Sequence, residues 1–205
     1  MSVLLGNGDG TFVPKQDFPT GDRPRSVAIG DVNEDGHPDL AVADYGDNTV
    51  SVLLGKGYGT FLANQDFPTG NRPQSMAMGD VNGDGYPDLA VANSYSSTVS
   101  VLLGKGGSTF LLKQDFQIGH RPWSVAIGDV NGDGHPDLTV ANYFDNTVSV
   151  LLGKGDGAFL PKQDFPTGKA PFCVVVGDVN GDGHLDLAVA NNYDNTVSLL
   201  LNTSQ

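Results

Sequence analysis

The sequence predicts an all-β fold built from repeated four-stranded units, and three observations support that prediction. A motif of the type DVNGDGHPDL starts at residues 31, 80, 129 and 178, so its copies follow one another at intervals of 49 residues. Short apolar runs alternate with clusters of glycine, proline, aspartate and asparagine, which is the pattern of strands joined by turns. No window of the sequence shows the periodicity of an amphipathic helix over three turns.

Each unit divides into four predicted strands, which the first complete unit illustrates. The strands are expected at residues 26–32, 39–43, 49–55 and 60–67. The second and third strands are apolar or small on both faces, as expected in a sheet that is covered on both sides. Four strands in about 45–50 residues are typical of one blade of a β-propeller. A solenoid of stacked turns is the competing interpretation, but solenoid repeats are usually shorter and carry fewer strands.

The units extend over the whole chain, so residues 1–205 are predicted to form one propeller or half-propeller domain. The repeats fall at residues 26–74, 75–123, 124–172 and 173–205, and residues 1–25 are expected to close the last of them. This closure would give four blades in a monomer, with SVLLG at 2–6 and SLLLN at 198–202 competing for one strand position. Because a ring of four is tight and an open ring leaves a strand edge unpaired, we favour a homodimer in which two chains make eight blades.

The charge of the chain restricts its partners. Its 205 residues carry 24 acidic against 11 basic side chains, for a net charge of −13. Such a chain lacks the basic surface that nucleic acids and anionic membranes require, so neither partner is expected. No apolar run approaches the roughly 20 residues that span a bilayer, so membrane insertion is not expected either. The single cysteine, Cys173, excludes an internal disulfide, and the start MSVLLG indicates an initiator methionine on a fragment of something longer.

The aspartate-rich motif has the oxygen spacing of a calcium loop. In the copy at 129–137, side-chain oxygens fall at positions 1, 3, 5 and 9, and position 7 can turn its backbone carbonyl inward. Glycine at position 6 allows the tight turn that such a loop needs. Position 12 is Val140 rather than the bidentate glutamate of an EF-hand, so the loop is expected to join two strands of a blade.

The alternative is that these aspartates only make polar turns. Twelve aspartates, half of the 24 acidic side chains of the protein, occupy the predicted ligand positions of the four loops. Two carboxylates about 4 Å apart repel each other by ~4 kcal/mol at an effective dielectric constant near 20, so three convergent carboxylates would strain an empty loop. Magnesium demands stricter octahedral geometry and zinc prefers histidine or thiolate ligands, so we predict about four calcium ions per chain.

The predicted calcium ligands occupy the same five positions of each loop, with position 7 contributing its backbone carbonyl. They are Asp31, Asn33, Asp35, His37 and Asp39; Asp80, Asn82, Asp84, Tyr86 and Asp88; Asp129, Asn131, Asp133, His135 and Asp137; and Asp178, Asn180, Asp182, His184 and Asp186. Low-affinity calcium loops fill where calcium is millimolar, so an extracellular or periplasmic location is expected.

A family resemblance rests on these same residues. DVNGDGHPDLTVAN at 129–142, followed by TVSVLLGKGDGAF at 147–159, resembles the FG-GAP/VCBS repeat of integrin-α-like β-propellers, and the likeness covers essentially the whole chain. The resemblance implies that the DxNxDGxxD loop joins adjacent strands of a blade and binds calcium at the positions named above. The Phe-Gly and Gly-Ala-Pro signatures of the integrin type are not spelled out, so the VCBS branch is nearer. The family usually closes seven blades, whereas this chain has about four.

The sequence favours binding over catalysis. It contains no GxSxG nucleophile elbow, no HExxH motif and no phosphate-cradling glycine loop. Repeated units provide several equivalent pockets, and weak sites gain avidity for a multivalent ligand. Aromatic residues near the strand ends, beside asparagine and aspartate, are suited to stacking on sugar rings, so the sequence favours a glycan or another cell-surface ligand. The candidate ligand-binding residues are Tyr45, Tyr95, Trp123, Tyr143 and Tyr193.

Three alternatives stay open. The rings can instead pack between blades. The chain can be a structural or assembly fragment, or a plain array of repeats, with no ligand beyond calcium. It can also be an accessory domain of a secreted polysaccharide-degrading enzyme, of the kind that the resemblance includes.

Overall fold

The computed structural model describes residues 1–107 and 109–203 and confirms the all-β prediction. Its strands recur at the same positions of every unit. The first strands are β3 (Pro24–Gly30), β7 (Pro73–Gly79), β11 (Pro122–Gly128) and β15 (Pro171–Gly177). The second strands are β4 (Asp39–Asp44), β8 (Asp88–Asn93), β12 (Asp137–Asn142) and β16 (Asp186–Asn191). The third strands are β5 (Thr49–Leu53), β9 (Thr98–Leu102), β13 (Thr147–Leu151) and β17 (Thr196–Leu200).

The fourth strands are shorter than the sequence predicts. They are β6 (Gln65–Pro68), β10 (Gln114–Gln117) and β14 (Gln163–Pro166). The residues before each of them form a hairpin held by a single bridge, such as the one between Gly55 and Phe61. Proline, glycine and lysine-rich turns interrupt the ladder there, so only the last four residues pair continuously with the third strand. Near the N-terminus, β1 (Ser2–Val3) and β2 (Gln16–Asp17) occupy the third- and fourth-strand positions of a preceding unit.

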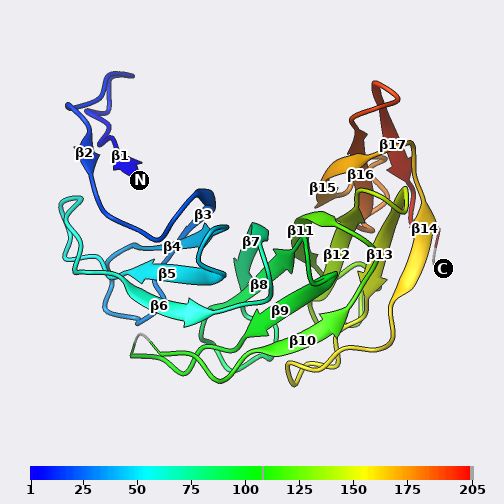
Figure 1. Ribbon diagram of the computed structural model, residues 1–205. Helices are drawn as coiled ribbons and strands as arrows, with labels where there is room; N and C mark the ends of the chain where they lie inside the picture. The colour runs from blue at the N-terminus through cyan, green and yellow to red at the C-terminus, as the bar shows by residue number, and fades with distance from the viewer. Residues whose placement is uncertain (108, 204–205) are drawn as a thin grey trace.

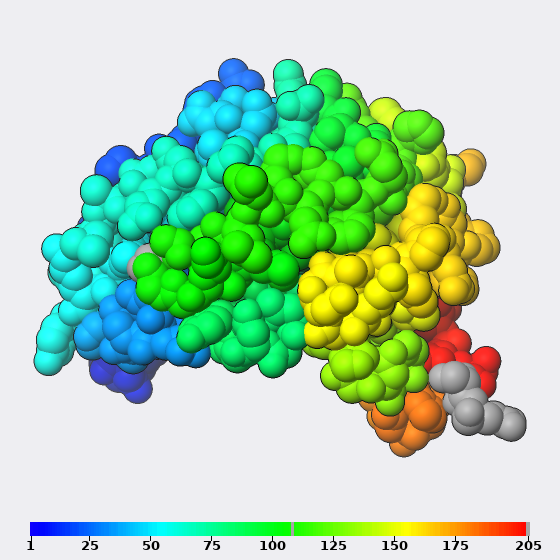
Figure 2. All heavy atoms as spheres, turned by 90° about the horizontal axis from the view of Figure 1, so that it is seen from below, coloured from blue at the N-terminus to red at the C-terminus, as the bar shows by residue number. Residues whose placement is uncertain are grey.

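The sheets are antiparallel meanders, as a propeller blade requires. Three of them have four strands, in the orders β3-β4-β5-β6, β7-β8-β9-β10 and β11-β12-β13-β14. A fourth sheet has three strands, β15-β16-β17, and β1 pairs with β2 alone. The first strands of consecutive sheets lie next to one another, so the sheets stand side by side along an arc (Figure 1). Seen from below, the units follow one another in chain order (Figure 2).

The core lies between neighbouring sheets. Every residue of β4, β8 and β12 is buried, because each of these central strands is covered on both faces. One interface packs Val99 and Val101 of one sheet against Val125 and Leu138 of the next. Burying a valine or leucine side chain stabilises a fold by about 1.5–3 kcal/mol. The cohesion of the molecule therefore comes from contacts between consecutive units.

The arc is open, which corrects the expected closure of the last unit by residues 1–25. Among the described strands, β2 pairs only with β1, and β17 pairs only with β16. The two ends lie at opposite ends of the arc (Figure 1). The physical reason is that β2 leads directly into β3, and Met1, Val3 and Phe18 pack against the core of that first whole sheet. The N-terminal strands are therefore held beside β4, far from β17.

Within residues 1–107 and 109–203, no helix has the length and apolar character that crossing a membrane would require.

Candidate metal loops and an aromatic row

The four acidic loops lie at one end of the sheets. Each loop joins the first strand of a unit to the second: β3 ends at Gly30 and β4 begins at Asp39, and these two residues are paired across the strands. The antiparallel register therefore folds the eight intervening residues into a compact turn. The loops join adjacent strands of one blade, as the sequence predicts.

Side chains at odd positions turn back onto the backbone of their own loop. In the third unit, Gly132 N and Gly134 N donate to Asp129 Oδ1 and Oδ2 at 2.7 and 2.8 Å. Asp133 N donates to Asn131 Oδ1 at 3.1 Å. Gly134 has a φ of +88°, a conformation that residues with a Cβ rarely adopt. The glycine at position 6 thus allows the curl that gathers these oxygens.

The aspartate at position 9 anchors each loop to the rest of the sheet. Asp137 is fully buried, and its two carboxylate oxygens accept Val130 N at 2.9 Å and Gly153 N at 2.7 Å. The corresponding Asp88 is also fully buried. Burial, together with the nearby charges of Asp84 and Asp80, raises its pKa to about 6 against the lowering effect of its two backbone hydrogen bonds. A buried carboxylate close to two others is stabilised by a proton or by a cation.

The side chain at position 7 points away from the loop, as expected. A Cβ placed on Gly155 would lie 2.4 Å from His135 Nδ1, so the imidazole covers the GKG hairpin of the same unit. Tyr86 covers Gly106 in the same way. The backbone carbonyl of this position, rather than its ring, is therefore the group available to the loop.

The donor set of the loops fits calcium in its chemistry. Each loop offers three carboxylates, one amide oxygen and one backbone carbonyl, all hard oxygen ligands. Among the described residues, no three histidine, cysteine, aspartate or glutamate side chains stand grouped as a metal centre. The carboxylates instead accept the loop's own N–H groups. The side chains at positions 1, 3 and 5, which are half-buried or exposed, would have to turn toward the ion, and the buried position-9 aspartate would stay in place.

The candidate ligand-binding aromatics lie at the opposite end of the sheets. Tyr45 directly follows β4, and Arg72 directly precedes β7. The Arg72 guanidinium lies 5.0 Å from the Tyr45 ring centroid and 4.2 Å from that of Tyr95, and it donates to the Tyr45 hydroxyl at 2.7 Å. Arg121 lies 4.9 Å from both the Tyr95 and the Phe144 rings. Arginine and aromatic side chains thus alternate from unit to unit.

The row continues as an all-aromatic cluster in the third and fourth units. Trp123 stacks on Tyr143 with centroids 5.0 Å apart and planes 25° apart, and it contacts Phe172 at 4.6 Å. Tyr143 meets Tyr193 edge-on at 5.7 Å. The indole Nε1 of Trp123 is buried and has no hydrogen-bond partner among the described residues. We call the whole set the aromatic row; it comprises Arg25, Tyr45, Arg72, Tyr95, Arg121, Trp123, Tyr143, Phe144, Phe172 and Tyr193.

All five predicted aromatics belong to this row, and their rings do contact side chains of neighbouring units. Tyr95 and Tyr193 nevertheless keep 52% and 69% of their surface exposed, so each has a free face. Sequence reasoning missed the arginines that stack between the rings. The recurrence of Arg-Pro at 72–73 and 121–122, one unit apart, is the signal that could have found them.

Together, the fold and the loops define a repeat protein of the β-propeller class, with acidic loops at one end and an aromatic row at the other. The sequence matches the FG-GAP-like repeat at residues 1–42, 31–91, 80–140 and 129–189. The chain therefore belongs to the FG-GAP-like repeat family. No curated protein matches its sequence.

Solved structures share the fold at low identity. One is BBS1N in complex with ARL6DN (TM-score 0.58, 15% identity, 90% of this chain and 56% of that chain). A second is the V. cholerae biofilm matrix protein Bap1 (0.56, 19%, 85% and 26%). A third is the Bacillus licheniformis rhamnogalacturonan lyase PL11 (0.54, 15%, 80% and 39%). The chain spans between about a quarter and a little over half of these proteins.

Proposed function

We infer that this chain is a non-catalytic, calcium-stabilised propeller module that binds an extracellular or periplasmic ligand, with a glycan as the best candidate. The observation that carries the proposal is the aromatic row, which runs across four consecutive units and keeps exposed ring faces on Tyr95 and Tyr193. Flat aromatic faces beside hydrogen-bonding side chains suit a ligand with an apolar face and a polar rim, such as a sugar ring.

The calcium part of the proposal rests on the acidic loops. Calcium bound only by the folded state stabilises it by ~2.7 kcal/mol per site when its concentration is 100 times the dissociation constant. The melting temperature should therefore rise strongly with calcium, rise little with magnesium, and fall with a chelator. If chelation leaves the melting temperature unchanged, the aspartates are turn formers and the proposed metal sites are wrong.

The glycan part is tested by binding to a glycan array, followed by calorimetry on the strongest hit. Tyr193→Ala should weaken binding by roughly five- to thirtyfold, because stacking of an exposed ring contributes on the order of 1–2 kcal/mol. Tyr58→Ala is the matched control: Tyr58 is 98% exposed and lies on a hairpin outside the row. Equal losses in both variants, or an array without hits, would contradict glycan binding at the row.

A protein ligand is the second candidate for the same row. Its support is the three arginines stacked among the rings, since arginine and tyrosine are enriched at the energetic centres of protein interfaces. The fold-related BBS1N was solved bound to a protein, ARL6DN. The fold similarity to a rhamnogalacturonan lyase supports a further alternative, an accessory domain of a polysaccharide-degrading enzyme. A chain that binds calcium alone, and neither glycan nor protein, would be a structural or assembly module.

A further inference from the structure

Consecutive units are joined by a recurring pair of phenylalanine rings. Each pair joins the end of one fourth strand to the hairpin that precedes the next fourth strand. The rings meet edge-on at 5.0–5.1 Å with interplanar angles of 76–81°, an arrangement favoured by the ring quadrupoles. The pairs are Phe18–Phe61, Phe67–Phe110 and Phe116–Phe159.

Two phenylalanines belong to this series but have no ring partner among the described residues. Phe165 is the next member at the strand end, and Phe12 is the preceding member at the hairpin. Phe165 is 39% exposed and Phe12 is 62% exposed, whereas Phe159 in a complete pair is 8% exposed. One unpaired ring therefore lies toward each end of the arc.

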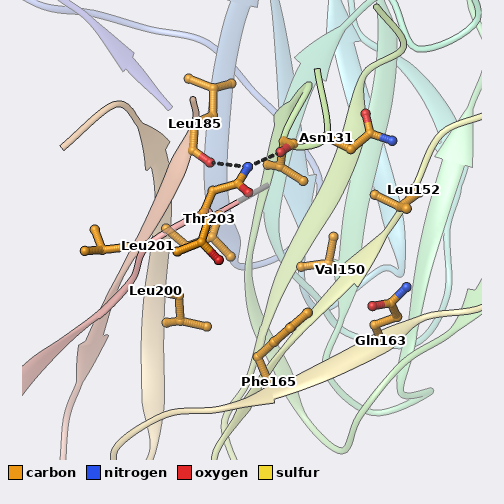
Figure 3. A pocket seen from close by; sticks show the side chains of 12 residues that line it. Asn131, Val150, Leu152, Gln163, Phe165, Leu185, Leu200, Leu201 and Thr203 are labelled. Atoms are coloured by element: carbon orange, nitrogen blue, oxygen red, sulfur yellow. Dashed lines mark hydrogen bonds between the residues drawn. The ribbon is translucent and has the colours of Figure 1, made fainter. Parts of the chain in front are cut away.

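Phe165 lines a cavity of about 360 Å³ at the C-terminal end of the arc. Val150, Leu200 and Phe165 face this space (Figure 3). Its apolar walls include Val130, Val150, Leu152, Phe165, Leu187 and Leu200. The residues 49 positions earlier are Val81, Val101, Leu103, Phe116, Leu138 and Leu151, and all of them pack in the same core cluster as Phe159. The cavity thus reproduces the walls of a phenylalanine site.

The first and last sheets of the arc each expose an apolar face that is buried in the inner sheets. Val27 of β3 is 54% exposed, whereas its counterparts Met76 and Val125 are 7% and 5% exposed inside the arc. Val197 of β17 is 64% exposed, whereas its counterpart Val148 is fully buried. Inside the arc, the third-strand face of one unit packs against the first-strand face of the next. The two exposed faces are therefore the two halves of that same interface.

We propose that a second copy of this chain completes the C-terminal sheet: its β2 pairs with the free edge of β17, and its Phe12 enters the cavity beside Phe165. The repeat fixes the register, because Ser149 lies opposite Asp164 and donates to it at 2.6 Å. By the same spacing, Ser198 lies opposite Asp17 of the second copy. Within one chain, Asp17 accepts instead from Ser2 Oγ at 2.6 Å, so β1 stands in for β17.

The exchange displaces β1, which is paired with β2 at two residues and whose Val3, together with Met1, packs against the core of the first sheet. Val197 and Leu199 of the incoming β17 occupy the same positions of the repeat, are 64% and 54% exposed in the single chain, and would take over that packing. β17 is itself paired with β16 over five residues. Because each chain offers one of each end, two chains close into a ring with two identical junctions and two-fold symmetry. This inference does not depend on the ligand of the aromatic row or on calcium occupancy.

The first test is the mass in solution, by analytical ultracentrifugation in calcium-containing buffer over a concentration series. We expect the mass of two chains. Phe12→Ser should raise the dimer dissociation constant by about a hundredfold or more, because a ring leaves apolar surroundings at both junctions. Phe12 is exposed in the single chain, so this substitution removes no core contact there. Tyr58→Ser, an exposed aromatic on the equivalent hairpin of the next unit, should leave the mass unchanged.

The second test locates the junction, in a Cys173→Ser background. Directly opposite residues on antiparallel strands have Cα atoms at distances that a disulfide can bridge. Oxidising a mixture of the single variants Asp17→Cys and Ser198→Cys should give a covalent heterodimer. A one-chain mass at all concentrations, an assembly larger than two chains, or a dimer that Phe12→Ser leaves intact would overturn the proposal. A third variant carries both Asp17→Cys and Ser198→Cys in one chain. If the disulfide forms only within that chain, and not between the two single variants, the last sheet is closed by the chain's own N-terminus and the proposal is wrong.

Discussion

At the scale of single residues, a buried serine on the third strand joins three strands of each sheet. In the second unit, Asn93 Nδ2 donates to Ser100 Oγ at 2.8 Å. Ser100 Oγ in turn donates to Asp115 Oδ1 at 2.6 Å. The asparagine amide donates to the serine hydroxyl and the hydroxyl donates to the carboxylate, so each of these three groups acts as a donor or acceptor that suits its neighbour.

The first unit breaks this pattern because it has Asp44 in place of the asparagine. The single hydroxyl proton of Ser51 faces two carboxylates, those of Asp44 and Asp66, at 2.7 Å each. Asp44 is fully buried and its Oδ1 has no partner among the described residues; the same holds for the Oδ1 atoms of the asparagines in the other units, but those carry no charge. Burial raises the pKa of Asp44, and the charge of Asp66 also raises it, against hydrogen bonds from Ser51 and Gly21 that lower it.

Asp44→Asn should therefore stabilise the protein at neutral pH, by on the order of 1–3 kcal/mol, since it removes a poorly satisfied buried charge. A raised carboxyl pKa means that the folded state loses stability as pH rises from the ordinary value of 3.8 through the raised one. The gain should thus be small near pH 3.5 and full at pH 7. Urea unfolding of both proteins at the two pH values measures it, and a gain that does not change with pH would contradict this account.

Glu34 is the other residue at which the first unit is strained. It has a φ of +58°, whereas the other three loops have glycine at the same position. A left-handed conformation costs a residue with a Cβ about 1–2 kcal/mol. Glu34→Gly should therefore raise the free energy of unfolding by roughly 1 kcal/mol. Glu34→Gln keeps the Cβ and removes the charge; if it gives the same gain in urea unfolding, repulsion rather than backbone strain is the cause.

At the scale of elements, the loop between the first and second strands is the unit of the proposed calcium binding. Asp133→Asn should remove one carboxylate from the third loop and reduce the calcium-induced stabilisation by about one site's share, ~2.7 kcal/mol at saturating calcium. Asp156→Asn is the control, because Asp156 only accepts Ala158 N in a hairpin outside the loop. Calorimetric melts with calcium and with chelator make the comparison. An Asp133→Asn protein that gains as much from calcium as the control would argue against this loop as a site.

The strand pattern could be predicted from the sequence because each central strand is buried on both faces. Val50, Val52 and Ala41 made the second and third strands evident, and the structure places them between two sheets. The fourth strand was predicted too long because the apolar residues Phe61 and Leu62 were included in it. The chain there instead bends into a hairpin with one bridge. Local pattern alone does not distinguish a continuous ladder from an interrupted one.

The candidate sites were predictable to different degrees for a related reason. The loop oxygens are close in sequence, so their spacing was sufficient to place them on one turn. The aromatic row is built from residues about 25 positions apart, such as Arg72 and Tyr45, which meet only after the sheets have formed. The aromatic residues could be predicted because they recur near the strand ends. The arginines between them could not, because their contacts with the rings form only when neighbouring units pack together.

At the scale of the whole molecule, the repeat determines the number of units but not the closure of the arc. An open arc and a closed ring have the same periodicity, because both repeat the same contacts between neighbours. What differs is whether β1 or β17 fills the third-strand position at the end. That outcome depends on the packing of Met1, Val3 and Phe18 against the first sheet, a competition that strand patterns do not resolve.

The equivalence of the interfaces between units also bears on how the gene can change. An unequal crossover between two copies of the 49-residue repeat would add or remove one whole unit and leave the amino-acid sequence of the neighbouring units unchanged. The first and last sheets would keep the same exposed faces, since those belong to the repeat register and not to the number of units. Variants with more or fewer units would thus keep complementary faces on their first and last sheets. The curvature of each arc would determine how many chains close into a ring.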